Sequence, residues 1–338
     1  MGDVRAQAAG LTELFGVGEP RGMREAARGA MGAVWRLETG AAARSGLDGS
    51  SIGTAGVFAA KELFWFEGDL ASVRREVAFR TACADAGVRS PMPLASISGE
   101  YVVQHEGVWW RLYEWVEGEV PDHSEVDVTT WLAEQMAVIQ SLDWQGGAAA
   151  PVPFYHRVDA DWLVLTEAAK RAQVEWTEAL ERVLPLLSEL TSLVNSVPVG
   201  EQVWCHRDLK NTNVLRPRDT PSTVAEGNWL VDWDNVGPLA PERELGALLM
   251  KHLDKPDNLL RIVDAYRAAG GPAKIDTPAG FATGVAIHLN FLHGQANAAM
   301  DTDLAEAHRQ YAAQQITGLI TSLPTPETLK KAAEAIQQ

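Results

Sequence analysis

Two short stretches of the chain decide its fold: Trp204-Cys205-His206-Arg207-Asp208-Leu209-Lys210-Asn211-Thr212-Asn213-Val214-Leu215 and Leu230-Val231-Asp232-Trp233-Asp234. In the first stretch, an asparagine stands five residues after an aspartate, between apolar runs. In the second, two aspartates follow an apolar run. Short apolar runs of this kind are typical of buried strands, so both stretches predict polar side chains presented where a strand ends.

These residue types meet the needs of phosphoryl transfer from ATP. The reaction needs a carboxylate that orients the attacking hydroxyl group and accepts its proton, and it needs oxygen ligands for Mg²⁺. Asp208 fits the first role. Asn213 and Asp232 offer an amide oxygen and a carboxylate, the hard donors that Mg²⁺ prefers.

The first third of the chain has the pattern of strands. Residues 22–28 and 33–39 predict two strands joined by a tight turn, which small residues permit. Residues 57–63 predict a third strand that carries Lys61 near its end. A lysine in this place can clamp the α- and β-phosphates of a nucleotide.

One helix and a hairpin complete this β-rich part. Apolar spacing predicts a helix over 70–86, with Asp69 as its N-cap and Gly87 as its stop. The helix carries Glu76, which could hold the lysine of the preceding strand. Residues 101–113 then predict a β-hairpin.

After Gly118 helical spacing dominates, with one β-like interruption at 202–235. The predicted helical segments are 128–142, 159–195 with a break at Pro185, 240–268 and 278–322. The chain therefore predicts an α+β fold of two lobes: a β-rich N-lobe with one helix and a larger, mainly helical C-lobe. Its expected divisions are 1–113, a hinge at 114–118, and 119–338.

The spacing His206-x-Asp208-x-x-x-x-Asn213, followed by Asp232 in an apolar segment, resembles that of aminoglycoside phosphotransferases and choline-kinase-like enzymes. These families share the protein-kinase fold. The resemblance implies that Asp208 is the catalytic aspartate and that Asn213 and Asp232 are the metal ligands. It also implies that Lys61 pairs with Glu76, and it gives His206 a structural role in tying the loop of Asp208 to the metal-binding segment.

The same resemblance implies a nucleotide site made of backbone groups. Gly29 and Gly32 would belong to the nucleotide loop, and Glu114, Trp115 and Val116 would contact the purine base at the hinge. A hinge of this kind reads the base through its main chain, so both ATP and GTP stay open as the donor.

Two alternatives to a small-molecule kinase stay open, a protein kinase and a nucleotide-binding module without turnover. Arg207 and Lys210 are typical of protein kinases, and Lys210 could reach the transferred phosphate. However, 90 residues separate Val116 from His206, enough for the extra helices of a substrate floor, and Ala240-Pro241-Glu242 begins only eight residues after Asp232. The residues expected to act as base, phosphate clamp and metal ligands are all present, which disfavours a module without turnover.

The composition and net charge limit the classes of partner that the protein is expected to bind. The 338 residues are 46% apolar and 22% charged, as in a globular protein, with a net charge of −16. This acidity disfavours nucleic-acid binding, which needs a basic surface, and favours cationic small molecules. The chain has only two cysteines and no apolar run long enough to span a membrane, so we expect a cytoplasmic protein that binds no membrane. The oligomeric state is not readable.

The acidity is concentrated where the acceptor is expected to bind. Residues 117–201 hold fifteen carboxylates against four basic residues, a net −11 of the chain's −16. We therefore expect an amine-bearing acceptor such as an aminoglycoside, an amino sugar or a similar molecule, in antibiotic resistance or in metabolism. The residues proposed to contact it are Asp159, Asp161 and Asp234.

Overall fold

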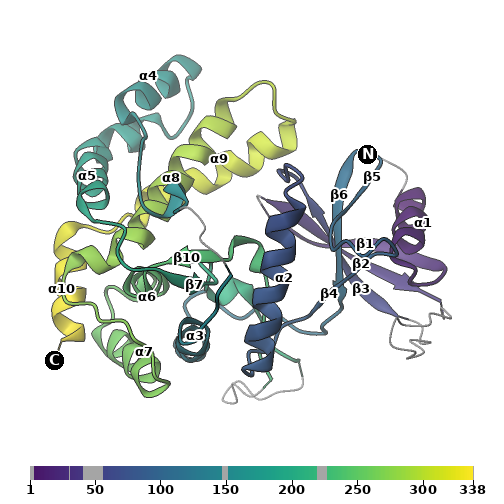
Figure 1. Cartoon of the computed structure of the whole chain (residues 1–338). Coiled ribbons are helices and arrows are strands. Elements are labelled where there is room, and N and C mark those ends of the chain that lie inside the picture. Colours follow the sequence, from purple (N-terminus) through teal and green to yellow (C-terminus); the bar gives the residue numbers. More distant parts are fainter. Residues whose placement is uncertain (1–3, 30, 41–55, 147–150, 219–226, 338) are drawn as a thin grey trace. The chain divides into compact units, whose positions relative to one another are not determined.

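The computed structural model describes residues 4–29, 31–40, 56–146, 151–218 and 227–337. It divides into two compact units (Figure 1). The first unit comprises Met1–Glu119 and Leu215–Asp234, and the second comprises Val120–Val214 and Asn235–Gln338. The turn expected between the first two strands includes Ala30, which lies outside the described residues.

A six-stranded antiparallel sheet forms the first unit, in the order β1-β2-β3-β6-β4 with β5 paired to β6 (Figure 1). The strands are β1 (Pro20–Arg28), β2 (Gly32–Thr39), β3 (Val57–Leu63), β4 (Pro93–Leu94), β5 (Val103–His105) and β6 (Val108–Glu114). Alternate residues of a strand point to opposite faces. Ala60 and Leu112 therefore join the core under α1 (Val4–Phe15), while Lys61 and Arg111, which pair in register, share the other face.

Helix α2 (Leu70–Asp85) begins and ends as the sequence predicts. Asp69 accepts a hydrogen bond from the Ser72 N–H at 3.0 Å, which caps the first turn. Gly87 follows the last turn with φ of +98°, a left-handed conformation that glycine adopts without a steric cost. Val73 and Val77 of the helix pack with Val102 in a small apolar core of their own.

The segment Leu215–Asp234 belongs to the first unit, whereas the sequence analysis placed it in the C-terminal lobe. It contains β9 (Trp229–Leu230), which pairs with β8 (Val214–Leu215). The Leu230 N–H donates to the Arg89 carbonyl at 2.8 Å, and Trp233 packs edge-on against Phe79 of α2. These contacts hold the segment to α2 and the loop that follows it, a proximity that no local sequence pattern reveals.

The second unit is mainly helical (Figure 1). Its helices are α3 (Val126–Gln140), α4 (Trp162–Ala172), α5 (Thr177–Ser196), α6 (Pro241–Leu249), α7 (Pro256–Ala268), α8 (Ala282–Met300), α9 (Glu306–Thr321) and α10 (Pro326–Ile336). Its short elements are the ribbon of β7 (Val203–Cys205) and β10 (Gly237–Leu239) and the 3₁₀ turns η1 (Pro153–Tyr155), η2 (Asn211–Asn213) and η4 (Pro278–Phe281), while η3 (Trp233–Asn235) spans the border between the units. Helix α8 packs against α5, α6 and α9, and Leu289 and Leu292 of α8 are completely buried.

The break expected at Pro185 is wrong. Helix α5 runs through this proline, and the helical stretch is interrupted earlier, between α4 and α5. Gln173 ends α4 there in the left-handed region, with φ of 53°. A helix can continue through an interior proline when the packing of its apolar face outweighs the lost backbone hydrogen bond. Leu187 and Leu190 of α5 are completely buried and provide that packing.

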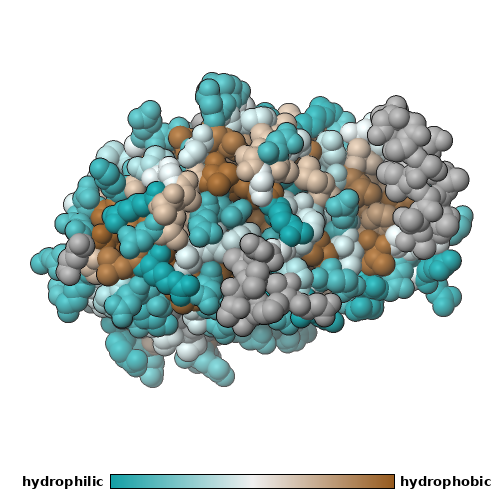
Figure 2. Space-filling model, turned by 90° about the horizontal axis from the view of Figure 1, so that it is seen from below, coloured by the Kyte–Doolittle hydropathy of each residue, from teal (hydrophilic) through white to brown (hydrophobic). Residues whose placement is uncertain are grey.

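Surface character agrees with the composition. On the face drawn in Figure 2, hydrophilic residues cover much of the surface and apolar residues show between them. No helix in the part of the chain that the structure describes is both long and apolar enough to cross a membrane.

Candidate active site

Asp208 stands in the loop that follows β7, here called the Asp208 loop (residues 206–213). Its carboxylate Oδ2 accepts hydrogen bonds from Lys210 Nζ and Asn213 Nδ2, each at 2.9 Å. Asn213 Nδ2 also donates to the Asp208 carbonyl at 2.8 Å, and the buried His206 accepts from the Asp208 N–H at 3.3 Å. The side chain of Asp208 is 22% exposed. The loop therefore holds a partly exposed carboxylate in one orientation.

Arg207 anchors this loop from a left-handed conformation, with φ of 64°. Such a conformation costs a non-glycine residue ~1–3 kcal/mol, so the surroundings must enforce it. The Arg207 N–H donates to Glu244 Oε1 at 2.7 Å, and its guanidinium donates to the carbonyls of Asn235 and Val236. The guanidinium also lies over the ring of Tyr155, 4.6 Å from its centroid.

Glu244 supports the loop from a buried position on α6. Burial raises the pKa of Glu244, although hydrogen bonds from the Arg207 backbone and the side chain of Gln140 act in the opposite direction. The Nε2 of Gln140 donates to the Glu244 carboxylate at 2.7 Å, and its Oε1 accepts from the Tyr266 hydroxyl at 2.5 Å. The strained backbone at Arg207 therefore rests on buried polar groups of three helices.

Asn211 fixes the other end of the loop. Its Nδ2 donates to the carbonyls of Asp122 and Glu125, each at 2.9 Å, and its Oδ1 accepts from the Thr129 hydroxyl at 2.9 Å. The Thr129 hydroxyl has one proton, so it accepts from His252 Nε2, which lies 3.0 Å away. Asn258 Nδ2 lies 3.3 Å from His252 Nδ1 and donates to it, which requires a neutral ring, and burial lowers the pKa of His252. The sequence analysis did not single out Asn211, because an asparagine in a loop is ordinary.

A charge cluster forms in the first unit around Lys61. Its Nζ lies 2.6 Å from Asp232 Oδ1 and 2.6 Å from Asp234 Oδ2. Burial disfavours the charged lysine, yet Asp234 and Asp232 together raise the pKa of Lys61 above its ordinary value. Asp232 has φ of 64°, so a left-handed residue stands at this candidate site as well. The structure therefore brings together Lys61 and Asp232, two of the predicted site residues.

The predicted pair of Lys61 and Glu76 is wrong. Glu76 Oε2 is instead paired with Arg111 Nη2, and Glu76 Oε1 lies 3.6 Å from Arg80 Nη1. Two cations, Lys61 and Arg111, share this face of the sheet, and the guanidinium takes the buried glutamate while the lysine faces the aspartates. The charge cluster is thus Lys61, Glu76, Arg80, Arg111, Asp232 and Asp234.

Asp234 lies inside this cluster and was predicted as a substrate contact. Its two oxygens are shared between Lys61 and Arg111, the latter at 2.9 Å. Loss of hydration raises the pKa of Asp234, but the charges of Lys61 and Arg111 outweigh this and hold it well below its usual range. The structure therefore gives Asp234 a role in holding two cations.

The other predicted substrate carboxylates have local partners. Asp161 caps α4 by accepting from the Val164 N–H at 3.0 Å. Asp159 is exposed and pairs with Arg157. A carboxylate at the start of a helix is stabilised by the unpaired N–H groups of the first turn. This capping accounts for Asp161 without a substrate.

The predicted nucleotide loop and hinge lie around the same sheet. A Cβ at Gly32 would come within 2.2 Å of the Glu62 carbonyl, so this position tolerates only glycine. The Gly29 N–H donates to the Gly32 carbonyl at 2.9 Å. At the hinge, the Glu114 and Trp115 N–H groups donate to the carbonyls of Met92 and Val57. Because these two N–H groups already donate to main-chain carbonyls, the predicted contacts to a base would come from the hinge carbonyls and from Val116.

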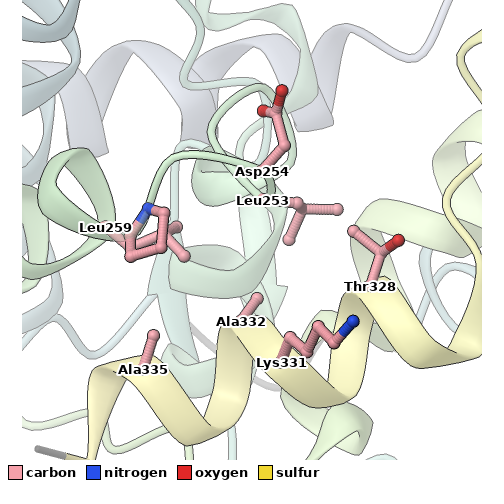
Figure 3. A pocket seen from close by; sticks show the side chains of 8 residues that line it. Leu253, Asp254, Leu259, Thr328, Lys331, Ala332 and Ala335 are labelled. Carbon is pink, nitrogen blue, oxygen red and sulfur yellow. The ribbon is translucent and has the colours of Figure 1, made fainter.

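The described part of the chain also contains a cavity. It has a volume of about 220 Å³ and opens between α7 and α10 in the second unit (Figure 3). It is lined by Leu253, Asp254, Pro256, Leu259, Thr328, Lys331, Ala332 and Ala335. None of these is a predicted site residue. Within the described ranges, no group of three or more His, Cys, Asp or Glu side chains could hold a metal ion.

The chain is similar to known proteins in its sequence and in its fold. The sequence model of a family described as "phosphotransferase enzyme family" matches residues 65–281, nearly two thirds of the chain. No curated protein matches the sequence.

Solved structures of the same fold are similar over nearly the whole chain. A spectinomycin phosphotransferase in complex with ADP and spectinomycin has a TM-score of 0.63 at 13% identity, covering 97% of this chain and 100% of that one. An aminoglycoside phosphotransferase from Alicyclobacillus acidocaldarius has a TM-score of 0.59 at 14% identity, covering 100% and 98%. A microcompartment-associated aminopropanol kinase has a TM-score of 0.58 at 17% identity, covering 94% and 95%. This likeness confirms the predicted α+β fold with a β-rich part and a larger helical part.

Proposed function

The chain belongs to the phosphotransferase enzyme family, and we propose that it moves the γ-phosphate of ATP or GTP to a hydroxyl group of a small, amine-bearing molecule. The observation that carries this proposal is the orientation of Asp208. Its Oδ2 is held by Lys210 and Asn213, each at 2.9 Å, while part of the side chain stays exposed. A carboxylate held in this way can accept a proton without first reorganising.

In the proposed reaction Asp208 accepts the proton of the acceptor hydroxyl as the hydroxyl oxygen attacks the γ-phosphorus, and the bond from this phosphorus to the nucleoside diphosphate breaks. The ammonium of Lys210 lies beside this carboxylate and is exposed enough to approach the transferred phosphoryl group. Positioning and charge stabilisation are the main sources of rate in such transfers, since the protein supplies little covalent chemistry. The hydrogen bonds to Glu244 and Asn211 keep the loop in place during the transfer.

Lys61 and Asp232 of the charge cluster, together with Asn213, supply the groups proposed for the nucleotide and its metal ion. Lys61 would exchange a carboxylate partner for phosphate oxygens. Asp232 and Asn213 are hard oxygen donors suited to Mg²⁺, and Asn213 directs its NH₂ group to Asp208, which leaves the amide oxygen for a cation. A bound Mg²⁺ would neutralise charge on the phosphates, with its other ligands coming from phosphate oxygens and water.

The class of acceptor follows from charge. Residues 117–201 carry a net charge of −11, a field that concentrates cations near this part of the second unit. Two similar structures are named for amine-bearing acceptors, an aminoglycoside and aminopropanol. Both observations support an acceptor with at least one protonated amine.

Matched acceptors test this proposal. A coupled assay of nucleoside diphosphate release would compare 1-amino-2-propanol with 1,2-propanediol and glucosamine with glucose, beside a panel of aminoglycosides. We expect turnover with an amine-bearing acceptor, loss of that turnover in Asp208→Asn, and a KM that rises with ionic strength because salt screens the field. Equal turnover of neutral acceptors, with a KM that does not change with ionic strength, would contradict the amine requirement.

A further inference from the structure

The charge cluster contains a buried arginine that the proposed reaction does not use. We propose that Arg111 is a positioning residue that orients Lys61 toward the nucleotide phosphates through Asp234. This inference rests on the proposed function, because it concerns the lysine that would bind the phosphates. Arg111 itself is 3% exposed, so it acts through its neighbours.

The ion pairs form an unbroken chain. Glu76 is paired with Arg111 Nη2, Arg111 Nη1 lies 2.9 Å from Asp234 Oδ1, and Asp234 Oδ2 lies 2.6 Å from Lys61 Nζ. Each oxygen of Asp234 is thus taken by a different cation. The position of Lys61 therefore depends on Asp234, and the position of Asp234 depends on Arg111.

The chemistry of arginine suits this role. Its planar guanidinium presents two nitrogens in a fixed fork, so one side chain can hold two carboxylates in a set geometry. Lys61 has a flexible four-carbon stem, which by itself leaves its ammonium in many positions. A carboxylate that is fixed on one side by Arg111 removes much of that freedom on the other.

The balance of charge explains why the arrangement survives nucleotide binding. The cluster has three carboxylates and three cations, so it is neutral as it stands. When phosphate oxygens attract the ammonium of Lys61, the lysine still needs a partner that stays in place. Asp234 can serve as that anchor because Arg111 keeps it charged and in place.

Arg80 is a matched control for Arg111. Both guanidinium groups are buried and both face Glu76. Arg80 donates to the Ser90 hydroxyl at 2.8 Å and to the Pro91 carbonyl, and its ion pair is with Glu76. Replacing either arginine by lysine removes a guanidinium group from Glu76, but only the replacement of Arg111 removes the ion pair with Asp234.

The experiment measures the Kd of Mg²⁺–ADP and of adenosine by calorimetry in wild type, Arg111→Lys and Arg80→Lys. We expect Arg111→Lys to raise the Kd of Mg²⁺–ADP about tenfold, the scale of losing one hydrogen bond between charged groups, and to leave the Kd of adenosine within twofold. Arg80→Lys should change both Kd values by less than twofold, whatever its effect on Tm. Glu76→Gln, which loosens Arg111 from its other side, should give a smaller loss of the same kind and serves if Arg111→Lys does not fold.

A double-mutant cycle with Lys61→Met tests whether the effect passes through the lysine. If it does, Arg111→Lys adds less than twofold to the Kd of Mg²⁺–ADP once Lys61 is absent. Fully additive losses, an equal loss in Arg80→Lys, or an unchanged Kd in Arg111→Lys would overturn the inference while leaving the proposed function intact. A wild-type protein that binds neither adenosine nor Mg²⁺–ADP would overturn both.

Discussion

The charge cluster and the Asp208 loop hold their central side chains by different physical means. In the charge cluster, Lys61 and Arg111 are fixed by ion pairs with neighbouring carboxylates. In the loop, the strained backbone at Arg207 is fixed by a hydrogen bond to the buried Glu244, and Asn211 of the loop donates to the Asp122 carbonyl. An ion pair can exchange one charged partner for another, whereas a buried hydrogen-bonding group that loses its partner is left unsatisfied.

This difference fits the tasks proposed for the two regions. A group that binds phosphates must release one charged partner and accept another. A general base must keep one orientation from the free enzyme to the transition state. We therefore expect substitutions of Lys61, Arg111 or Asp232 in the charge cluster to act mainly on nucleotide binding, and substitutions beneath the Asp208 loop to act mainly on stability and turnover.

The largest effect should come from Asp208 itself. We expect Asp208→Asn to lower kcat by at least ~10², the usual scale for losing a positioned base, because the amide cannot take up the hydroxyl proton. The Kd of Mg²⁺–ADP should stay within about twofold of wild type, since Asp208 itself contacts neither the nucleotide nor the metal ion in the proposed reaction. Steady-state kinetics measures the change in kcat, and calorimetry measures the Kd of Mg²⁺–ADP. Wild-type turnover in this variant would remove Asp208 from its role.

A smaller loss is expected from Lys61→Met. Removing the phosphate clamp should lower kcat and raise the nucleotide KM, each by about tenfold, because the charge acts both on binding and on the transition state. Lys170→Met is the matched control, since Lys170 also contacts two carboxylates, Glu167 and Glu181, but on the surface. Equal kinetics in the two lysine variants would contradict the role of Lys61 as the phosphate clamp.

Sequence reasoning predicted local features well and side-chain partners poorly. The cap of α2 by Asp69 and the strand β2 follow from patterns within a few residues, and both are present. The pairing of Lys61 with Glu76 was wrong because it depends on which of two cations on one sheet face reaches the glutamate. A pattern along one strand does not decide that competition.

The same limit applies at the loop and at the ends of the chain. Asp208 and Asn213 lie five residues apart, so a single loop can bring them together, as the structure does. Arg111 had no local signal, because an arginine in a strand reads as a surface residue until its neighbours are known. Helices α1 and α10 were also missed, since each is short and depends on packing against other elements for its stability.

A stability measurement probes the hydrogen bonds beneath the loop. Asn211→Ala removes the donors to Asp122 and Glu125 and the acceptor for Thr129, so we expect a loss of ~1–3 kcal/mol in the free energy of unfolding. Urea unfolding measures it. Asn297→Ala is the control, because that amide is exposed and bonds only within its own helix in the contacts that the structure describes, and should change stability by less than ~0.5 kcal/mol. Equal losses would show that the Asp208 loop does not depend on Asn211.

The smallest effect should come from adding charge near the same loop. Burial, followed by the neighbouring Arg243 and Arg207, lowers the pKa of His156 to about 4. Its unfolded pKa is about 6.5, so the folded state favours the neutral ring, and the stability that this provides above pH 6.5 is lost as the pH falls toward 4. We expect the stability difference between wild type and His156→Gln to shrink by ~1–2 kcal/mol between pH 7 and pH 4.5, measured by urea unfolding at each pH. A difference that stays constant over this range would mean that the pKa of His156 is the same in the folded and the unfolded protein, and that the surroundings of Arg207 do not disfavour a charged ring.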